Sequence, residues 1–270
     1  MIETKNHKTE RLKELLADMG SVLVSFSGGV DSALLLHVAS EVLGEKAKAA
    51  TFISPIFPRI DLARAENLAA ELKVSYIKIP FNILSHQDFL INDSMRCRAC
   101  KMKMAEALKK EAATQGIATV VDGANQDDLG DYRPGLKVSR KAGIRSPLME
   151  AGFTKTDIRR EAKRRNMELW NVPASACLAS RIAYGTPIRE NHLSMIDQAE
   201  AFLRECGFRT VRVRYHAPVA RIEVSASEVP RLAELPIREK VIENLKSLGF
   251  TYVALDLSGY RSGSMNDVLP

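Results

Sequence analysis

Short apolar runs alternate with amphipathic stretches along the first half of the chain. Four runs have the length and character of buried strands: residues 22–26, 48–53, 74–79 and 119–121. Four other stretches carry apolar side chains at helical spacing: residues 3–18, 31–43, 60–72 and 98–112. Strands that alternate with helices predict an α/β fold with a doubly wound parallel sheet, covered by helices on both faces.

The regular alternation stops after the fourth run. Residues 123–147 are rich in Gly, Asp, Arg and Pro and show little periodicity, which predicts a long loop. A helix is expected over 154–166, capped by Thr154 or Thr156. Residues 171–188 again have the composition of a loop.

The last part of the chain has a different pattern. Two helices and three strands are expected there, at residues 192–206, 239–248, 210–215, 220–224 and 252–257. This mixture predicts a smaller α+β domain. We place a soft boundary near 180–190, which gives expected domains at 1–185 and 186–270.

Composition narrows the class of protein. Of the 270 residues, 46% are hydrophobic and 27% are charged, which is typical of a globular protein. No apolar stretch approaches a membrane span and no secretory signal is visible, so we expect a cytoplasmic protein without a membrane partner. The net charge of +6 is scattered, and it suits an anionic small molecule as well as nucleic acid.

The turn after the first predicted strand carries the strongest chemical signal. It reads Ser-Gly-Gly-Val-Asp-Ser over residues 27–32 and leads into a predicted helix. Two glycines let the backbone approach a phosphate closely, and the N–H groups at a helix N-terminus favour an anion. Asp31 would be repelled by bare phosphate, so it points to a bridging Mg²⁺. A strand–helix turn that merely needs glycine is the alternative, and the full string argues against it.

This string resembles the pyrophosphate-binding loop, or PP-loop, of the ATP-pyrophosphatase superfamily. The resemblance implies that the protein binds ATP, cleaves it between the α and β phosphates and adenylates a substrate. The sequence lacks G-x-x-x-x-G-K-[ST], so it is not a Walker-type nucleotide-binding protein.

Further strings, in order along the chain, resemble the LarE family of ATP-dependent sulfur transferases. They lie at residues 122–123, 128, 131–137, 174–181, 184–186, 210–216, 220–223, 247–250, 255–257 and 259–263. The resemblance therefore covers the chain from about residue 20 to its end. It implies adenylation of both carboxylates of pyridinium-3,5-biscarboxylic acid mononucleotide and their conversion to thiocarboxylates, for the nickel-pincer nucleotide cofactor of lactate racemase. It also implies a homohexamer.

The resemblance also assigns residues to the nucleotide site. They are Ser27, Gly28, Gly29, Asp31, Ser32, Ser54, Gly123, Asp131 and Arg133. Asp131 and Arg133 are expected to shape the nucleotide or substrate pocket, although an acidic turn is the alternative for this segment.

The cysteines address the source of sulfur. The four are Cys97, Cys100, Cys177 and Cys206, and in a reducing cytosol we expect no disulfides. One version of the family uses three cysteines to hold a [4Fe-4S] cluster that carries an extra sulfide, and Cys97, Cys100 and Cys177 resemble that set. The other version sacrifices one cysteine, which makes Cys177 alone the donor. A zinc site, a redox C-x-x-C pair and ordinary core cysteines remain alternatives.

Charged residues near the end of the chain are candidates for substrate binding. Arg212 and Arg214 alternate with valines on a predicted strand, so both side chains should share one face, about 7 Å apart. Such a pair suits a phosphate or a carboxylate, and a solvated strand face is the alternative. With the resemblance in view, we assign them, Glu200, Ser180, Asp31 and Cys177 to substrate binding and catalysis.

Two rival functions follow from the same motifs. A tRNA-thiolating PP-loop enzyme with a cluster predicts bound RNA and strong salt dependence, but the chain lacks an obvious extra RNA-binding domain. A nucleotide-binding regulator without turnover predicts ATP binding without release of pyrophosphate.

Overall fold

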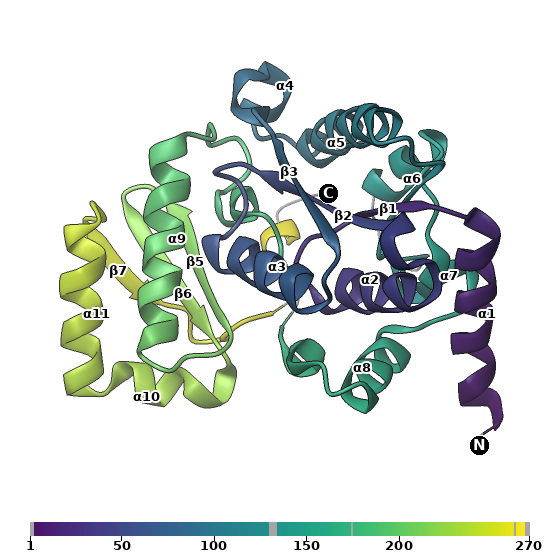
Figure 1. Ribbon diagram of the computed structural model, residues 1–270. Helices are drawn as coiled ribbons and strands as arrows, with labels where there is room; N and C mark the ends of the chain where they lie inside the picture. Colours follow the sequence, from purple (N-terminus) through teal and green to yellow (C-terminus); the bar gives the residue numbers. More distant parts are fainter. Residues whose placement is uncertain (1–2, 130–133, 174, 262, 268–270) are drawn as a thin grey trace. The chain divides into compact units, whose positions relative to one another are not determined.

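The computed structural model describes residues 3–129, 134–173, 175–261 and 263–267 (Figure 1). The chain forms two compact units that are discontinuous in sequence. The first contains residues 1–54, 60–83 and 97–175, and the second contains residues 55–59, 84–96 and 176–270. The predicted division after residue 185 stays a prediction.

The first unit is built on a four-stranded parallel sheet in the order β3-β2-β1-β4. Its strands are β1 (Val22–Ser25), β2 (Ala47–Ile53), β3 (Ser75–Pro80) and β4 (Thr119–Val121). The helices α2 (Val30–Leu43) and α3 (Arg59–Glu71) lie on one face and α5 (Arg96–Thr114) on the other (Figure 1). This confirms the predicted doubly wound sheet.

The strand order creates a switch point between β1 and β4. The chain leaves β1 toward β2 on one side, and it later enters β4 on the other side of β1. Ligands of open α/β sheets bind at the carboxyl ends of the strands at such a point. The Ser27–Ser32 turn lies there, directly after β1.

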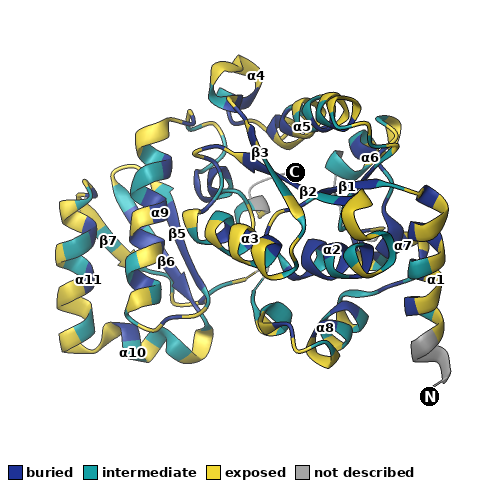
Figure 2. Cartoon of the chain, in the orientation of Figure 1, coloured by how far each residue is buried: buried dark blue, intermediate teal, exposed yellow. Residues whose placement is uncertain are grey.

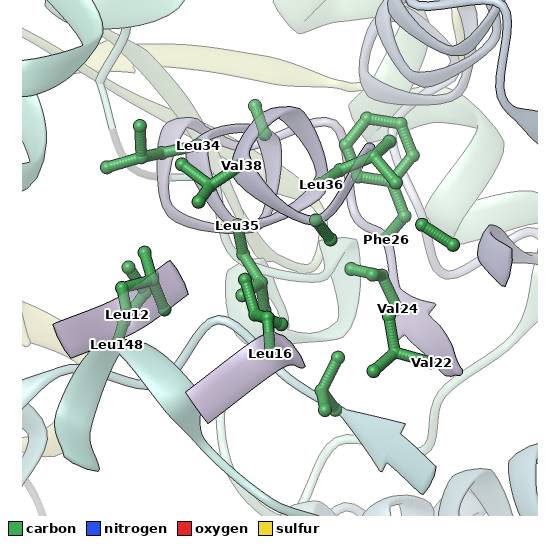
Figure 3. Packing of buried hydrophobic residues seen from close by; sticks show 14 of the residues in the cluster. Leu12, Leu16, Val22, Val24, Phe26, Leu34, Leu35, Leu36, Val38 and Leu148 are labelled. Atoms are coloured by element: carbon green, nitrogen blue, oxygen red, sulfur yellow. The ribbon is translucent and has the colours of Figure 1, made fainter. Parts of the chain in front are cut away.

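The core of the first unit surrounds α2 (Figure 3). Leu34, Leu35, Leu36 and Val38 are fully buried, so this helix is apolar on most of its circumference. They pack among side chains of α1 (Glu3–Met19), of β1 and the residue that follows its end, and of α7 (Pro147–Glu150), namely Leu12, Leu16, Val22, Val24, Phe26 and Leu148. The packing of this enclosed helix fixes the place of its N-terminal end at the switch point.

The second unit contains a three-stranded mixed sheet in the order β5-β6-β7. The strands β5 (Val211–His216) and β6 (Val219–Val224) are antiparallel, and β7 (Tyr252–Leu255) is parallel to β6. The helices are α4 (Gln87–Leu90), α9 (Glu190–Glu205), α10 (Val229–Ala233) and α11 (Leu235–Ser247). Strands β5 and β6 are largely buried, whereas α11 carries many exposed residues (Figure 2). The predicted smaller α+β region is confirmed.

Two local predictions need correction. The segment 123–147, predicted as a loop, contains α6 (Pro134–Lys141), and Arg145 pairs with Val121 at the edge of the sheet. An eight-residue helix and a single bridge are too short to give a periodic pattern. The helix predicted over 239–248 begins at Leu235 instead. Pro236 is tolerated in its first turn, because the backbone N–H that proline lacks would have no intrahelical partner there.

The helix expected after residue 154 is α8 (Lys155–Arg164), and Thr154 is its cap. The Thr154 hydroxyl accepts a hydrogen bond from the Asp157 amide, and the Asp157 carboxylate accepts one from the Thr154 amide. Within the described ranges, none of the helices combines the length and apolar character needed to cross a bilayer.

Candidate functional site

The turn after β1 has a geometry that only glycine permits at one position. Gly28 has φ +72°, and a Cβ atom there would lie 2.5 Å from the carbonyl oxygen of Asp61. The Ser27 and Ser32 hydroxyls are 3.2 Å apart, and the Ser32 hydroxyl donates to the Gly29 carbonyl at 3.1 Å. The turn is therefore shaped by its own side chains and by close packing against α3.

The N-terminus of α2 is open to an anion. Gly29 is the N-cap residue and offers no side chain to cap the helix. The amides of the first turn are those that an α-helix leaves without intrahelical partners. Together with the helix dipole, they form a site that favours phosphate. Ser32 is buried beside this turn, and its hydroxyl donates to the Gly29 carbonyl.

Asp31 lies in the first turn of α2. Its Oδ2 accepts a hydrogen bond from the ammonium of Lys155, the first residue of α8. Its Oδ1 is buried without a hydrogen-bond partner among the described residues. A buried carboxylate oxygen with an open coordination position suits a hard divalent cation. The donor at Asp31 therefore fits a Mg²⁺ ion bound with the phosphates.

The end of β4 lies against the same turn. A Cβ atom on Gly123 would lie 2.8 Å from the amide nitrogen of Ser32, so the two backbones are in contact. The neighbouring Asp122 accepts hydrogen bonds from the Ser146 hydroxyl at 2.7 Å and the Ala124 amide at 3.2 Å. Burial raises the pKa of Asp122, and these hydrogen bonds oppose that shift.

Other predicted nucleotide-site residues take different positions. Ser54 follows β2 at the carboxyl edge of the sheet and is buried, and its hydroxyl finds no partner within the described chain. Such a hydroxyl is suited to a ligand. Asp131 and Arg133 lie outside the described residues.

The segment that carries Cys177 belongs to the second unit and is fixed by Arg181. The guanidinium of Arg181 is fully buried and donates to the carbonyls of Ala176 at 2.7 Å and Cys177 at 3.2 Å. The Ser180 hydroxyl donates to the Cys177 carbonyl at 2.8 Å. The backbone at Cys177 is thus held by two side chains, while its thiol remains partly exposed.

Arg181 is paired with Glu200, which is also fully buried on α9. The Glu200 carboxylate accepts hydrogen bonds from Arg181 at 2.9 and 3.2 Å, from Arg204 at 2.7 Å and from the Val213 amide at 3.2 Å. Burial would raise the pKa of Glu200, but the charge and hydrogen bonds of Arg181 outweigh it, so the pKa is lowered. Glu200 therefore links α9, β5 and the Cys177 segment.

Arg212 and Arg214 lie two residues apart on β5, which gives them the same face of the strand. Arg212 is nearly buried and stacks on the Tyr260 ring at 5.1 Å. Burial, followed by the positive charge of Arg181, lowers the pKa of Arg212. Arg214 donates to the Glu223 carboxylate at 2.7 Å and to the Ser180 carbonyl at 3.1 Å.

The remaining cysteines lie on α5 and α9. Cys97 is exposed and Cys100 is buried, and their spacing of three residues on α5 puts both on one side of that helix. They belong to the first unit and Cys177 to the second. In the part of the chain that is described, no three His, Cys, Asp or Glu side chains are grouped as ligands of a metal ion.

One residue of this site was missed by the sequence reasoning. Lys155 contacts the Asp31 carboxylate, yet it is separated from Asp31 by 124 positions. A lysine at the start of a helix carries no local signal of such a contact. Only the position of α8 beside α2 brings the two side chains together.

One family model and several known proteins are similar to this chain. Residues 5–110 match the family model of NAD synthase. The chain is 40% identical over 263 residues to the pyridinium-3,5-bisthiocarboxylic acid mononucleotide synthase of Lactiplantibacillus plantarum, covering 97% of this chain and 95% of that protein. Uncharacterised proteins of Synechocystis sp. and Methanocaldococcus jannaschii are 35% and 30% identical, each over 97% of this chain and at least 97% of their own.

The match to the synthase extends through both units, and the turn after β1 has the sequence and position of a PP-loop. The chain therefore belongs to the LarE family of PP-loop proteins, the family of the Lactiplantibacillus plantarum synthase.

Proposed function

We propose that this protein is an ATP-dependent sulfur transferase. It adenylates a carboxylate of pyridinium-3,5-biscarboxylic acid mononucleotide and converts it to a thiocarboxylate, as a step toward the nickel-pincer nucleotide cofactor of lactate racemase. The observation that carries this proposal is the Ser27–Ser32 turn at the switch point of the sheet, in a chain that is 40% identical to the synthase. ATP use by the PP-loop family supports the same function.

The first unit supplies the nucleotide site. The amides that begin α2 and the hydroxyls of Ser27 and Ser32 face the phosphates, and Gly28 and Gly123 keep the backbone close enough. Ser54 contributes a buried hydroxyl at the same edge. Asp31 would hold Mg²⁺, which when bound would offset the negative charge of the phosphates.

The chemistry requires two displacements. An oxygen of the substrate carboxylate attacks the α-phosphorus, the bond to the bridging oxygen breaks, and pyrophosphate leaves with the electron pair. The resulting acyl adenylate has AMP as a good leaving group. Sulfide that attacks the acyl carbon displaces AMP and leaves a thiocarboxylate directly. If the Cys177 thiolate attacks instead, the product is a thioester, and elimination that breaks the Cβ–S bond must follow to release the thiocarboxylate and leave dehydroalanine.

Cys97, Cys100 and Cys177 would hold a [4Fe-4S] cluster, which when bound would supply a sulfide. The spacing of Cys97 and Cys100 on α5 suits two ligands of one group. Cys177 lies in the second unit, and its place as the third ligand rests on the resemblance to the three-cysteine version of the family.

The face of β5 that carries Arg212 and Arg214 is proposed to bind the anionic groups of the substrate, beside Ser180. Arginine side chains bind phosphate and carboxylate in a planar, bidentate way. Glu200 acts through Arg181, because its carboxylate is enclosed and already accepts four hydrogen bonds from three residues. Its role is to keep Arg181 and β5 in position.

The decisive experiment combines purified protein with ATP, Mg²⁺ and the biscarboxylic acid mononucleotide, and measures pyrophosphate and the mass of the product. We expect pyrophosphate release and a product in which sulfur has replaced oxygen. D31N should abolish the release, and D88N, an exposed acidic residue of α4, serves as the matched control. If the wild-type protein releases no pyrophosphate with this substrate, the proposed function is wrong.

The sulfur source needs a second experiment. Protein purified without oxygen should contain iron and sulfide, and C97A should lose both while C206A retains them. Absence of iron, together with loss of hydrogen sulfide from Cys177 during the reaction, would refute the cluster and assign the sulfur to that residue.

We also propose a cytoplasmic homo-oligomer, by analogy with the family. A hexamer would elute far ahead of a chain of 29.9 kDa in size-exclusion chromatography with light scattering, and a monomeric mass would contradict the assembly.

A further inference from the structure

The chain continues past its last strand and returns to the sheet of the second unit. Strand β7 ends at Leu255, and residues 258–261 and 263–267 follow it. We call these residues the C-terminal segment. They belong to the same unit as β5 and β6, so their contacts with those strands depend only on the packing of that unit. The proposed function gives this segment no role.

The C-terminal segment is fixed against the end of β6. The Tyr260 amide donates a hydrogen bond to the Val224 carbonyl at 2.7 Å. Gly259 has φ +69°, and a Cβ atom there would lie 2.9 Å from the same carbonyl oxygen and 3.0 Å from the Cα atom of Ala226. Only glycine permits this approach. The backbone on which Tyr260 is carried therefore has a defined position.

The Tyr260 ring meets the guanidinium of Arg212 on β5. The guanidinium carbon lies 5.1 Å from the centre of the ring. Arg212 is only 6% exposed, and its Nη1 donates to the Val211 carbonyl at 2.7 Å. An aromatic face attracts a cation, and the attraction is larger where water is excluded. The ring thus stabilises the cation and restricts the directions in which it can point.

The charges around Arg212 show why such support matters. The guanidinium groups of Arg181 and Arg214 both repel it. The Glu200 carboxylate attracts it, but that carboxylate also pairs with Arg181 and Arg204. A buried cation among other cations is held at a cost, and an arriving anion would relieve that repulsion. Arg212 is therefore suited to bind an anion, provided that its side chain is kept in place.

The C-terminal segment also contacts the second arginine of β5. The Ser264 hydroxyl accepts a hydrogen bond from Nη2 of Arg214 at 3.2 Å and donates one to the Glu223 carboxylate at 3.2 Å. Both arginines that share one face of β5 are thus contacted by the same short segment, one by an aromatic ring and the other by a hydroxyl.

We propose that Tyr260 is a positioning residue for substrate binding, and that the C-terminal segment completes the anion-binding face of β5. This inference rests on the proposed function, which assigns Arg212 and Arg214 to the anionic groups of the substrate. Tyr260 acts through Arg212. Its ring holds the guanidinium in the orientation that meets the substrate, so less side-chain freedom is lost on binding. No bond forms or breaks in this role, and no proton moves.

A purely structural role for Tyr260 makes a different prediction. If the ring only packs against β5, its removal lowers the stability of the second unit, and any effect on the substrate is the same whether or not Arg212 is present. A residue that acts through Arg212 has no such independent effect. A double-mutant cycle between the two positions separates these cases.

The test measures binding of the biscarboxylic acid mononucleotide by titration calorimetry. Y260L should lose roughly 3- to 30-fold in affinity, as expected for a buried cation–π contact, and Y260F should retain most of it because the ring remains. Y252L is the matched control, since Tyr252 is a 62% exposed tyrosine on β7. Y260M keeps the test decisive if Y260L fails to fold.

The cycle and turnover give two further readouts. R212M should weaken binding, and Y260L should add little further loss in the R212M background. In turnover, Y260L should raise KM for the mononucleotide with little change in kcat for pyrophosphate release or in KM for ATP. The proposal is overturned if Y260L and Y260M bind like the wild type, if Y260F loses as much as Y260L, or if Y260L weakens binding equally with and without Arg212.

The two proposals can fail separately. If Y260L weakens binding of the mononucleotide but the wild type releases no pyrophosphate, the proposed function fails and the role of Tyr260 stands. If Y260L turns over with the KM of the wild type, the proposed function stands and the role of Tyr260 fails. If the wild type does not bind the mononucleotide, inorganic phosphate serves as the probe. Y260L and R212M should then weaken phosphate binding while Y260F and Y252L do not, and any other pattern overturns the inference.

Discussion

Replacement of Gly28 by alanine tests the geometry of the PP-loop directly. Two separate costs are expected. The backbone has φ +72°, a left-handed conformation that costs an alanine about 1–2 kcal/mol. The new Cβ would also lie 2.5 Å from the Asp61 carbonyl oxygen and 3.2 Å from the Ala65 amide nitrogen, both backbone atoms of α3.

The steric cost can be estimated from the atoms involved. A carbonyl in the interior of a helix cannot rotate away as the end of a flexible side chain can, so α3 and the turn must separate. Overpacking of this kind typically costs about 1–3 kcal/mol. We therefore expect G28A to lose roughly 2–5 kcal/mol in the free energy of unfolding, the sum of both terms.

Two other glycines of the chain separate these terms. Gly20 has φ +69°, and a Cβ atom there would have no neighbour within 4 Å, so G20A should lose only about 1–2 kcal/mol. Gly29 has φ −86°, and its Cβ would meet nothing closer than the Ser27 hydroxyl at 3.4 Å, so G29A should lose less than about 1 kcal/mol.

Urea unfolding of the three variants measures these free energies, and calorimetric titration with ATP measures the effect on the site. G28A should show the largest loss of stability and also weak ATP binding, because the turn is displaced from the phosphates. G20A should bind ATP normally. If G28A and G20A unfold with the same free energy, the close approach of the turn to α3 does not constrain the loop, and the reasoning is refuted.

Three further predictions concern other contacts. G123A should weaken ATP binding at least tenfold with near-normal folding, as seen by titration and circular dichroism, because its Cβ would lie 2.8 Å from the Ser32 amide. E200A should lose about 3–5 kcal/mol in urea unfolding, since it strands the fully buried Arg181 guanidinium; a loss below about 1 kcal/mol would contradict this. Hydrogen bonds from Lys8 and Thr154 overcome the opposing effect of burial and lower the pKa of Asp157 from 3.8 to about 2, so its contribution is full above about pH 4 and disappears toward about pH 2. After allowance for solvent screening, D157N should be about 1 kcal/mol less stable than the wild type at neutral pH. Urea unfolding of both proteins at neutral pH and at about pH 2 checks that this difference disappears in acid.

The strands of the first unit were predictable because of how parallel sheets are buried. Helices cover both faces, so a central strand such as β1 is apolar at consecutive positions rather than at alternate ones. The turn after β1 was predictable for a related reason. A backbone that packs closely against α3 and also has to approach phosphate leaves no room for a side chain. The glycine at position 28 therefore shows this constraint in the sequence.

The pairing at the edge of the same sheet could not be predicted from the sequence. Arg145 joins it by donating its backbone amide to the Val120 carbonyl at 3.0 Å, a bond that any residue except proline makes. Backbone contacts of this kind depend on which segment lies nearby, so they produce no pattern of side chains along the chain.

Side-chain contacts over long separations are hidden for a different reason. Lys155 and Asp31 meet only because α8 packs on α2, and lysine is an ordinary residue in the first turn of a helix. Arg181 lies within a string that the sequence analysis recognised. Its complete burial was not predictable, because the Glu200 carboxylate that pairs with it lies on α9. A motif can therefore predict which ligand binds, whereas ion pairs between residues far apart in the sequence become apparent only when the helices that carry them are packed.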